Sequence, residues 1–344
     1  MRARISDSSK SLETDDTADV GLKLDILRAR LKHATLDVIW RQWRVLGAGA
    51  ATRSGQDDHA LQTLIDPEAL LLVSLALMSE ERRLTDLLRD WGARNSDLLS
   101  VQRIKNLAVA YPAEVQGRLL SHLSWFATIA HDEGKDLRWR SVIGASPDSS
   151  VINDSPQARK GKVRSTRARL SADAAIMLRL RLGFGVGVKA DLLAYLLARA
   201  NELATVREIS EAVAYTATAV RRAAEDLAAA RLVESLEGQP ASYRITYEPW
   251  RGLLALEERP PRWASWQERF LFTTAFLHWA DTASARPLSL YVLGTQGREF
   301  LERYRSALER DLVVVWSAHT KIQNWPAFLG QAIHDLGGWM EEMA

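Results

Sequence analysis

The chain has 344 residues, which is long enough for two or three domains with cores of their own, and its 47% hydrophobic and 26% charged residues are typical of a folded globular protein. The absence of cysteine excludes disulfide bonds, thiolate nucleophiles and the usual zinc-finger sites. The N-terminus lacks the apolar segment of a signal peptide, and the longest apolar run, Ala69 to Met78, is too short to span a bilayer. We therefore expect a cytoplasmic protein without membrane contact.

The N-terminal part of the chain has the pattern of a helical domain. Residues 1–20 are polar, and we expect them to form a disordered tail. From Leu22 to Leu46, apolar side chains recur at steps of three and four, which predicts a long helix that packs on another helix, within the domain or across a dimer. Asp66 with Pro67 at the first turn starts the next helix after a breaker-rich loop. Further helices at 84–91, 101–110 and 112–130 complete a helical N-terminal domain over residues 21–145.

Two of these helices have the spacing of a helix-turn-helix. Their inward positions are apolar, and the second helix would present Gln102, Arg103 and Lys105 outward as a second DNA reader. A small helical bundle gives the same spacing, so both interpretations stay open.

A basic segment follows, with no periodic apolar pattern over residues 146–169, which we interpret as a domain linker. Nine basic residues and one acid lie between Ser155 and Lys189, a local charge of +8; the whole chain carries +2, so the remainder carries −6. A basic arm next to a DNA reader neutralises phosphates and releases counterions, whereas the alternative is a linker kept soluble by charge. The candidate phosphate contacts in this arm are Arg159, Lys160, Lys162, Arg164, Arg167 and Arg169.

Residues 170–250 have the pattern of a winged helix-turn-helix domain. After helices at 171–182 and 189–200, Thr205 and Glu208 fit a capping box that starts a short helix. Ala214 and Tyr215 form the bend, and Thr216 caps a second helix with an apolar inward stripe. A β-hairpin follows, with strands that begin at Leu232 and Ser242 and a turn at 237–240.

This region resembles the winged helix-turn-helix repressors of bacteria, the MarR-like and ArsR-like groups, over residues 189–247. The resemblance rests on VREISEAVAYTATAVRRAAEDLAAARLVES and the hairpin. It implies binding of double-stranded DNA by a reader helix at 216–231, with helices outside the winged core building a homodimer. Those repressors usually carry Gly where Arg231 stands here.

The candidate DNA contacts lie on the outward face of the reader helix and on the wing. Arginine suits base reading because its guanidinium can bind guanine O6 and N7 with two hydrogen bonds. On the returning strand, a basic residue would hold the DNA backbone. These candidates are Thr216, Thr218, Arg221, Arg222 and Arg244.

Residues 251–344 are predicted to form a helical C-terminal domain, with helices near 264–281, 295–310 and 325–340. Aromatic residues crowd its beginning, where they indicate either a packed core or an aromatic-lined effector pocket or dimer interface. They are Trp250, Trp263, Trp266, Phe270, Phe272, Phe276 and Trp279.

Signals for catalysis and cofactors are sparse. The glycines at 183, 185 and 187 match neither the P-loop nor the dinucleotide fingerprint. The seven histidines show no metal-ligand spacing, and no G-x-S-x-G elbow is present. We therefore expect no enzymatic activity, no cofactor and no metal.

Together these patterns predict a mainly α protein: a helical N-terminal domain, a central winged helix-turn-helix with a small β-hairpin wing, and a helical C-terminal domain. The predicted function is a DNA-binding transcriptional regulator, a repressor that acts as a homodimer. The alternative is a protein-interaction module, such as an antitoxin-like or defence-system component, that uses the winged helix to bind a protein partner.

Overall fold

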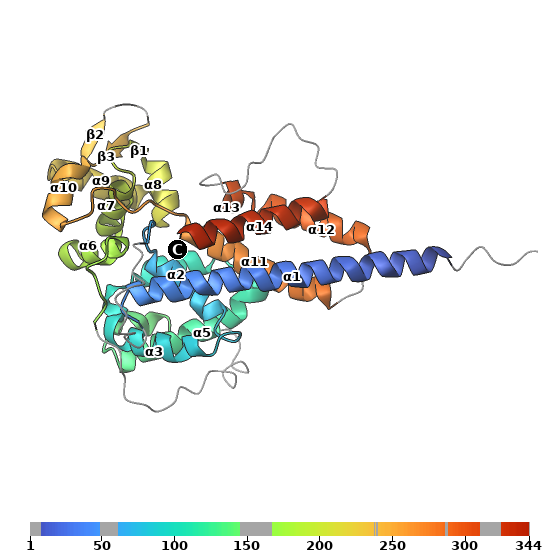
Figure 1. Ribbon diagram of the computed structural model, residues 1–344. Helices are drawn as coiled ribbons and strands as arrows, with labels where there is room; N and C mark the ends of the chain where they lie inside the picture. Colours follow the sequence, from blue (N-terminus) through green and yellow to red (C-terminus); the bar gives the residue numbers. More distant parts are fainter. Residues whose placement is uncertain are drawn as a thin grey trace, which may run out of the picture. The chain divides into compact units, whose positions relative to one another are not determined.

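The computed structural model describes residues 8–48, 61–144, 167–236, 238, 240–285, 288–309 and 325–343 (Figure 1). This part of the chain is mainly helical, with 14 α-helices and one small antiparallel sheet of three strands. None of its helices has the length and the apolar character needed to cross a membrane.

The chain divides into two compact units, and the division differs from the one expected from the sequence. One unit contains the chain up to Val38 together with Glu268–Met343, and the other contains Ile39–Gln267. The regions 21–145 and 170–250, which we expected to be separate domains, therefore lie largely in a single unit. Buried ion pairs connect the two regions.

The first unit is entirely helical in its described part. Its first helix begins at Ser8, so the expected disordered tail is wrong from that residue onwards, and residues 1–7 lie outside the described part. Arg28 of this helix donates to Asp281, and Thr35 donates to the sulfur of Met340, so the helix packs on two C-terminal helices. The helices of this unit are α1 (Ser8–Val45, which ends in the other unit), α11 (Trp266–Ser284, which begins there), α12 (Leu290–Arg303), α13 (Arg305–Glu309) and α14 (Trp325–Met343).

Aromatic rings fill the core of this first unit. Phe272 and Phe276 are fully buried. The ring of Phe300 meets that of Phe272 edge to face, with centroids 5.4 Å apart, and meets Tyr304 at 4.8 Å. Of the two interpretations of this aromatic run, the structure confirms core packing for Phe272 and Phe276.

The second unit begins with a bundle of short helices whose starts follow the sequence signals. The side chain of Asp66 accepts a hydrogen bond from the backbone N–H of Ala69, as expected for a helix cap, and Ser100 caps a later helix in the same way. Trp43 and Trp91 pack edge to face in the core with centroids 4.9 Å apart. The elements are α2 (Pro67–Ala76), α3 (Arg83–Asn95), η1 (Ser96–Leu98), α4 (Val101–Ala108), α5 (Ala113–Asp132) and η2 (Leu137–Ser141).

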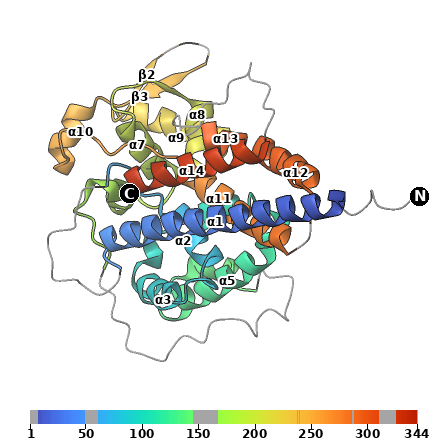
Figure 2. The same cartoon turned by 45° about the vertical axis from the view of Figure 1, so that its right-hand side comes forward.

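The rest of the second unit alternates helices with short strands (Figure 2). The sheet order is β1-β3-β2, both pairings are antiparallel, and Tyr243 lies opposite both Ala204 and Ser235. The strand β1 was not predicted, because two residues are too short for a periodic signal. The elements are η4 (Asp173–Ala175), α6 (Ile176–Phe184), α7 (Val188–Ala198), β1 (Ala204–Thr205), α8 (Val206–Val213), α9 (Ala217–Ala229), β2 (Glu234–Leu236), β3 (Ser242–Arg244) and α10 (Tyr247–Leu254).

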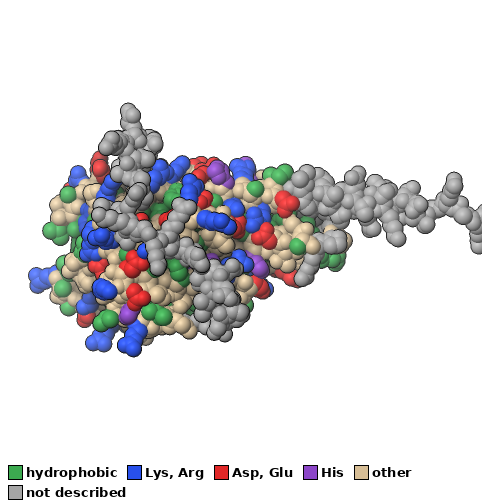
Figure 3. Space-filling view, turned by 90° about the horizontal axis from the view of Figure 1, so that it is seen from below, with side chains coloured by type: hydrophobic (Ala, Val, Ile, Leu, Met, Phe, Trp, Pro, Cys, Tyr) green, Lys and Arg blue, Asp and Glu red, His purple; other side chains and the backbone are tan. Residues whose placement is uncertain are grey.

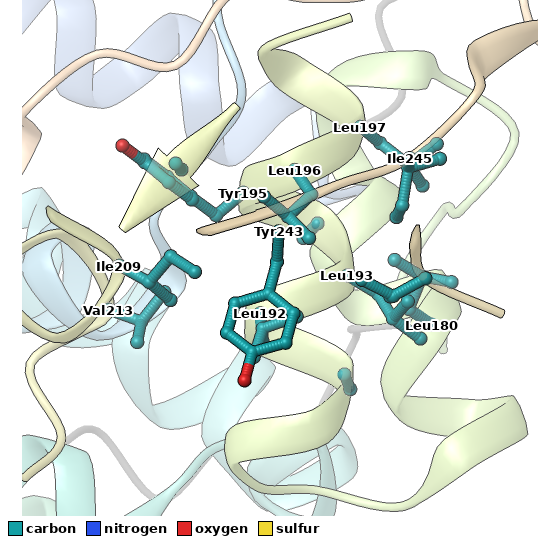
Figure 4. Packing of buried hydrophobic residues seen from close by; sticks show 14 of the residues in the cluster. Leu180, Leu192, Leu193, Tyr195, Leu196, Leu197, Ile209, Val213, Tyr243 and Ile245 are labelled. Atoms are coloured by element: carbon teal, nitrogen blue, oxygen red, sulfur yellow. The ribbon is translucent and has the colours of Figure 1, made fainter. Parts of the chain in front are cut away.

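Helix α7 is the centre of this part of the core (Figure 4). Leu192, Leu193 and Leu196 of α7 are fully buried, and they belong to one apolar cluster with Ile209 of α8 and Tyr243 of β3. Because α7 is apolar on nearly all sides, it can be covered by α6, α8 and α9 together. This core holds α9 rigidly from behind.

The second residue after α9, Arg231, occupies a backbone conformation that favours glycine. Arg231 has φ +59°, and its N–H donates to the carbonyl of Ala228. The bacterial repressors that this region of the sequence resembles usually carry Gly at this position. The left-handed conformation costs a residue with a side chain about 1–2 kcal/mol, so Arg231 is a point of local strain.

Replacing Arg231 by Gly should therefore stabilise the protein. We expect Arg231→Gly to raise the free energy of unfolding by about 1 kcal/mol, after the larger entropy of unfolded Gly is subtracted. Urea unfolding followed by circular dichroism measures this change. Arg231→Ala is the control, because it removes the guanidinium but keeps the penalty; equal stabilisation by both variants would contradict the explanation.

Candidate nucleic-acid interface

Helix α9 presents the four candidate side chains outward. The face of the helix that is turned to the core is buried; it consists of Val220, Ala223, Ala224 and Leu227. The candidate side chains are exposed: Thr216, Thr218, Arg221 and Arg222. The Thr216 hydroxyl caps the helix by accepting from the N–H of Ala219 at 3.3 Å.

The two arginines of this face are available for contacts. Within the described residues, neither Arg221 nor Arg222 forms an ion pair or a side-chain hydrogen bond. Further along the helix, Glu225 and Asp226 are also exposed, and Asp226 pairs with Lys189 of α7 at 2.8 Å. A hydrogen bond from Lys189 and its charge lower the pKa of Asp226, which keeps that carboxylate ionised. The cationic part of the face is therefore confined to the N-terminal half of α9.

Arg244, expected to hold the DNA backbone, is paired within the sheet. It lies directly opposite Glu234 in the β2–β3 register, and its Nε donates to that carboxylate at 2.7 Å. Thr246 donates to the other oxygen of Glu234. Both charged side chains are about half exposed, so the pair contributes little to stability.

The basic arm differs from the expectation where the structure describes it. Arg167 pairs with Asp97 at 2.8 Å and also donates to the carbonyl of Arg94 at 2.7 Å. The backbone of Ala168 donates to Asn95, and that of Arg169 donates to Leu46, so residues 167–169 are bound to the second unit. The expectation that Arg167 and Arg169 belong to a free arm is therefore wrong. Arg159, Lys160, Lys162 and Arg164 lie outside the described residues.

Two further basic residues of that segment do not contribute to a surface field. Arg181 is fully buried, and Arg179 donates to four backbone carbonyls, those of Leu170, Ser171, Ala172 and Leu254. On the face drawn in Figure 3, Lys and Arg side chains are interspersed with Asp and Glu side chains. The basic residues of this segment that the structure describes are thus largely compensated by carboxylates or backbone carbonyls.

A buried network of charges connects the helical bundle to the α6–α10 region. Its centre is Glu68, the second residue of α2, whose carboxylate accepts four hydrogen bonds. Arg181 donates to it at 2.6 and 2.9 Å, Arg103 at 2.7 Å and the backbone N–H of Ser100 at 2.8 Å. All three side chains of this ion cluster have 0% exposure.

The guanidinium of Arg181 is completely satisfied. It binds Asp191 of α7 with two hydrogen bonds of 2.7 and 2.9 Å, besides the two to Glu68. Its fifth N–H donates to the carbonyl of Leu98 at 2.9 Å. Since all five donors have partners, burial of this charge carries no unmet hydrogen bond.

Arg103 links the same network to the turn between α8 and α9. It binds Asp66 with two short hydrogen bonds, and its Nε donates to the carbonyl of Val213 at 2.8 Å. Tyr215 in the turn donates to Asp191 at 3.0 Å and shares a hydrogen bond with Ser100. The prediction that Arg103 points outward as part of a second reader is therefore wrong.

A sequence signal for this network exists. Arg103 lies four residues before Leu107 and three after Ser100, which puts it on the inward stripe of α4. Glu68 and Asp191 each stand in a helix that is otherwise almost wholly apolar. Acidic side chains in such helices require buried partners. The local sequence does not show which residues these partners are, because they lie far away in the chain.

The network keeps its central carboxylate, that of Glu68, ionised. Burial alone would raise the pKa of Glu68, but Arg181 and Arg103 outweigh it and lower this pKa from 4.5 to about 2. Around this carboxylate, two guanidiniums are shared among three acidic side chains, those of Asp66, Glu68 and Asp191.

Breaking this network should cost much more than breaking a surface pair. In Glu68→Gln, the amide NH₂ would face two guanidiniums, so we expect a loss of about 3–5 kcal/mol in the free energy of unfolding. The control is Asp97→Asn, which removes the exposed pair with Arg167 and should cost at most about 1 kcal/mol. Urea unfolding of both variants measures the difference, and similar losses would contradict the assignment.

The same carboxylate predicts a dependence on acid. Because the pKa of Glu68 is lower in the folded state, its contribution to stability is present above pH 4.5 and is lost as the pH falls towards 2. We expect urea midpoints measured across this range to fall more steeply for the parent protein than for Glu68→Gln. Parallel curves would show that Glu68 is not the titrating group.

Comparison of the chain with protein-family models, with curated proteins and with solved structures finds no match. Among the described residues, no group of three His, Cys, Asp or Glu side chains could hold a metal ion.

Proposed function

We propose that this protein is a DNA-binding transcriptional regulator, a cytoplasmic repressor that binds double-stranded DNA as a homodimer and reads the major groove with α9. The observation that carries the proposal is the pair of exposed arginines, Arg221 and Arg222, on a helix that is fixed from behind by an apolar core. The order α7, β1, α8, α9, β2, β3 supports the proposal, because a winged helix-turn-helix has this order of elements, and β2 and β3 would then form the wing.

The dimensions of α9 suit this role. Its 13 residues give a length of about 20 Å, and a major groove about 12 Å wide accepts an α-helix. Arg221 and Arg222 lie in its N-terminal half, together with the hydroxyls of Thr216 and Thr218, and side chains at this end of a reader helix reach the base edges. Glu225 and Asp226 repel phosphates, so contact should be confined to the first two turns of α9.

We expect a modest electrostatic contribution to binding from the described cations near α9. The chain carries a net charge of only +2, and Arg167, Arg244 and Lys189 already have carboxylate partners. Specificity would then depend on the side chains of α9 more than on the phosphate contacts of a basic arm.

Removing the first arginine should weaken and broaden DNA recognition. We expect Arg221→Ala to lose about 1–3 kcal/mol of binding free energy on the preferred sequence and to discriminate less against mismatched sites. Fluorescence anisotropy with duplexes from the DNA around its own gene measures both quantities.

The control for this experiment is Arg303→Ala on α12, an exposed arginine of the first unit, which should bind like the parent protein. An Arg221→Ala variant that binds as tightly and as selectively as the parent would reject the role of α9.

Binding of a protein partner is the second candidate, because apolar side chains are exposed on α6 and α10. Leu182 is 58% exposed, Phe184 41% and Leu253 74%, and the ring of Phe184 lies 6.1 Å from that of Trp250. Exposed apolar groups of this kind favour protein contacts over DNA contacts. A stoichiometric protein that co-purifies from the native host after nuclease treatment would favour this function over DNA reading.

A further inference from the structure

We infer that α4 and η2 extend the DNA-binding surface beyond α9, and that Lys105 and Arg140 contact the phosphates at the edge of the groove that α9 enters. The inference rests on the proposed function of α9 and adds a second element to it. It replaces the expectation of an independent second reader in the helical bundle.

Helix α4 is attached directly to the turn that precedes α9. The Nδ2 of Asn106 donates to the carbonyl of Ala214 at 2.9 Å, next to the bond from Arg103 to Val213. Ser100, the cap of α4, lies 3.0 Å from the hydroxyl of Tyr215 in the same turn. The N-terminal end of α9 therefore adjoins α4, at the end where its candidate DNA contacts lie.

The side of α4 that does not face the core is polar. Gln102 and Asn106 are exposed and hydrogen-bonded to each other at 2.9 Å, with the amide of Gln102 donating. Amide side chains such as these donate to phosphate oxygens in many DNA complexes. The outer surface of α4 can thus lie against a duplex backbone without burying an apolar side chain at these two positions.

Two cations continue this surface. Lys105 donates to the hydroxyl of Ser141 at 2.9 Å, which brings η2 beside α4. Arg140, the neighbour of Ser141, is exposed. Within the described ranges, neither Lys105 nor Arg140 forms an ion pair with a carboxylate, in contrast to Arg138, which binds Asp136. Their charges are therefore available to phosphates.

The distance expected between packed helices agrees with α4 lying at the edge of the groove that α9 enters. Packed helices lie about 8–10 Å apart between their axes, and the major groove is about 12 Å wide. An element packed at the N-terminal end of a helix inside the groove therefore lies near the groove wall, where the phosphates are. Contacts there would add affinity without sequence preference.

The test is the salt dependence of binding to a labelled random-sequence duplex of about 20 base pairs, which is close to two helical turns. For the double variant Lys105→Gln/Arg140→Gln, we expect the slope of log K against log salt to be flatter by about 1.8, because each lost phosphate contact removes about 0.9. Lys105→Arg keeps the charge and should retain its share of the slope.

The control is the variant Arg82→Gln. Arg82 is exposed and precedes α3, and the 13 residues of α3 separate it by about 20 Å from the η1–α4 region. It should leave the slope unchanged. An unchanged slope in the folded double variant, while Arg221→Ala still weakens binding, would overturn the role of α4 and η2 and leave α9 as the reader. A parent protein that does not bind duplex DNA would overturn both proposals.

Discussion

Two buried guanidiniums determine how the second unit is built. Arg103 and Arg181 bind Asp66, Glu68 and Asp191, with side-chain exposures of 0–2%, and they join α2 and α4 to α6, α7 and the turn before α9. Apolar packing alone tolerates small shifts between helices, whereas seven directed ion-pair hydrogen bonds around two planar groups permit essentially one arrangement. A buried charge network of this kind is costly to break, because each lost partner leaves an unpaired charge without water. The position of α9 relative to the helical bundle is therefore specified by electrostatics as much as by the core around α7.

This network also explains why the concentration of basic residues is misleading. Part of the +8 segment neutralises acids inside the fold or at its surface, so composition overestimates the field outside the protein. What remains at α9 and beside it is a small set of unpaired cations, which includes Arg221, Arg222 and Lys105. Unpaired cations at these positions act at short range, in contact with bases and nearby phosphates, because salt screens attraction over longer distances. The proposed mode of binding uses these short-range contacts.

Local patterns predicted the elements well, and the long-range contacts poorly. The caps at Asp66, Thr205 and Thr216 and the apolar stripe of α9 involve residues within a few positions of each other, so the sequence contains the whole signal. The outward position of Arg221 follows from the same periodicity. By contrast, the inward position of Arg103 depends on acids 35 and 37 positions away in the chain, and the two-residue strand β1 exists only because β3 pairs with it. The expected separation of the helical domain from the α6–α10 region failed for the same reason, because no local pattern reports a pairing between Glu68 and Arg181.

Hydrogen–deuterium exchange of the protein with and without a duplex from the DNA around its own gene tests the account most directly. If α9 enters the groove and α4 lies at its edge, saturating DNA should slow exchange in peptides that cover residues 216–222 and, to a smaller extent, 102–106. The peptides of α12, in the first unit, should exchange at the same rate in both samples. Slower exchange confined to other elements, or a duplex that binds without protecting residues 216–222, would contradict the assignment of α9 as the reader.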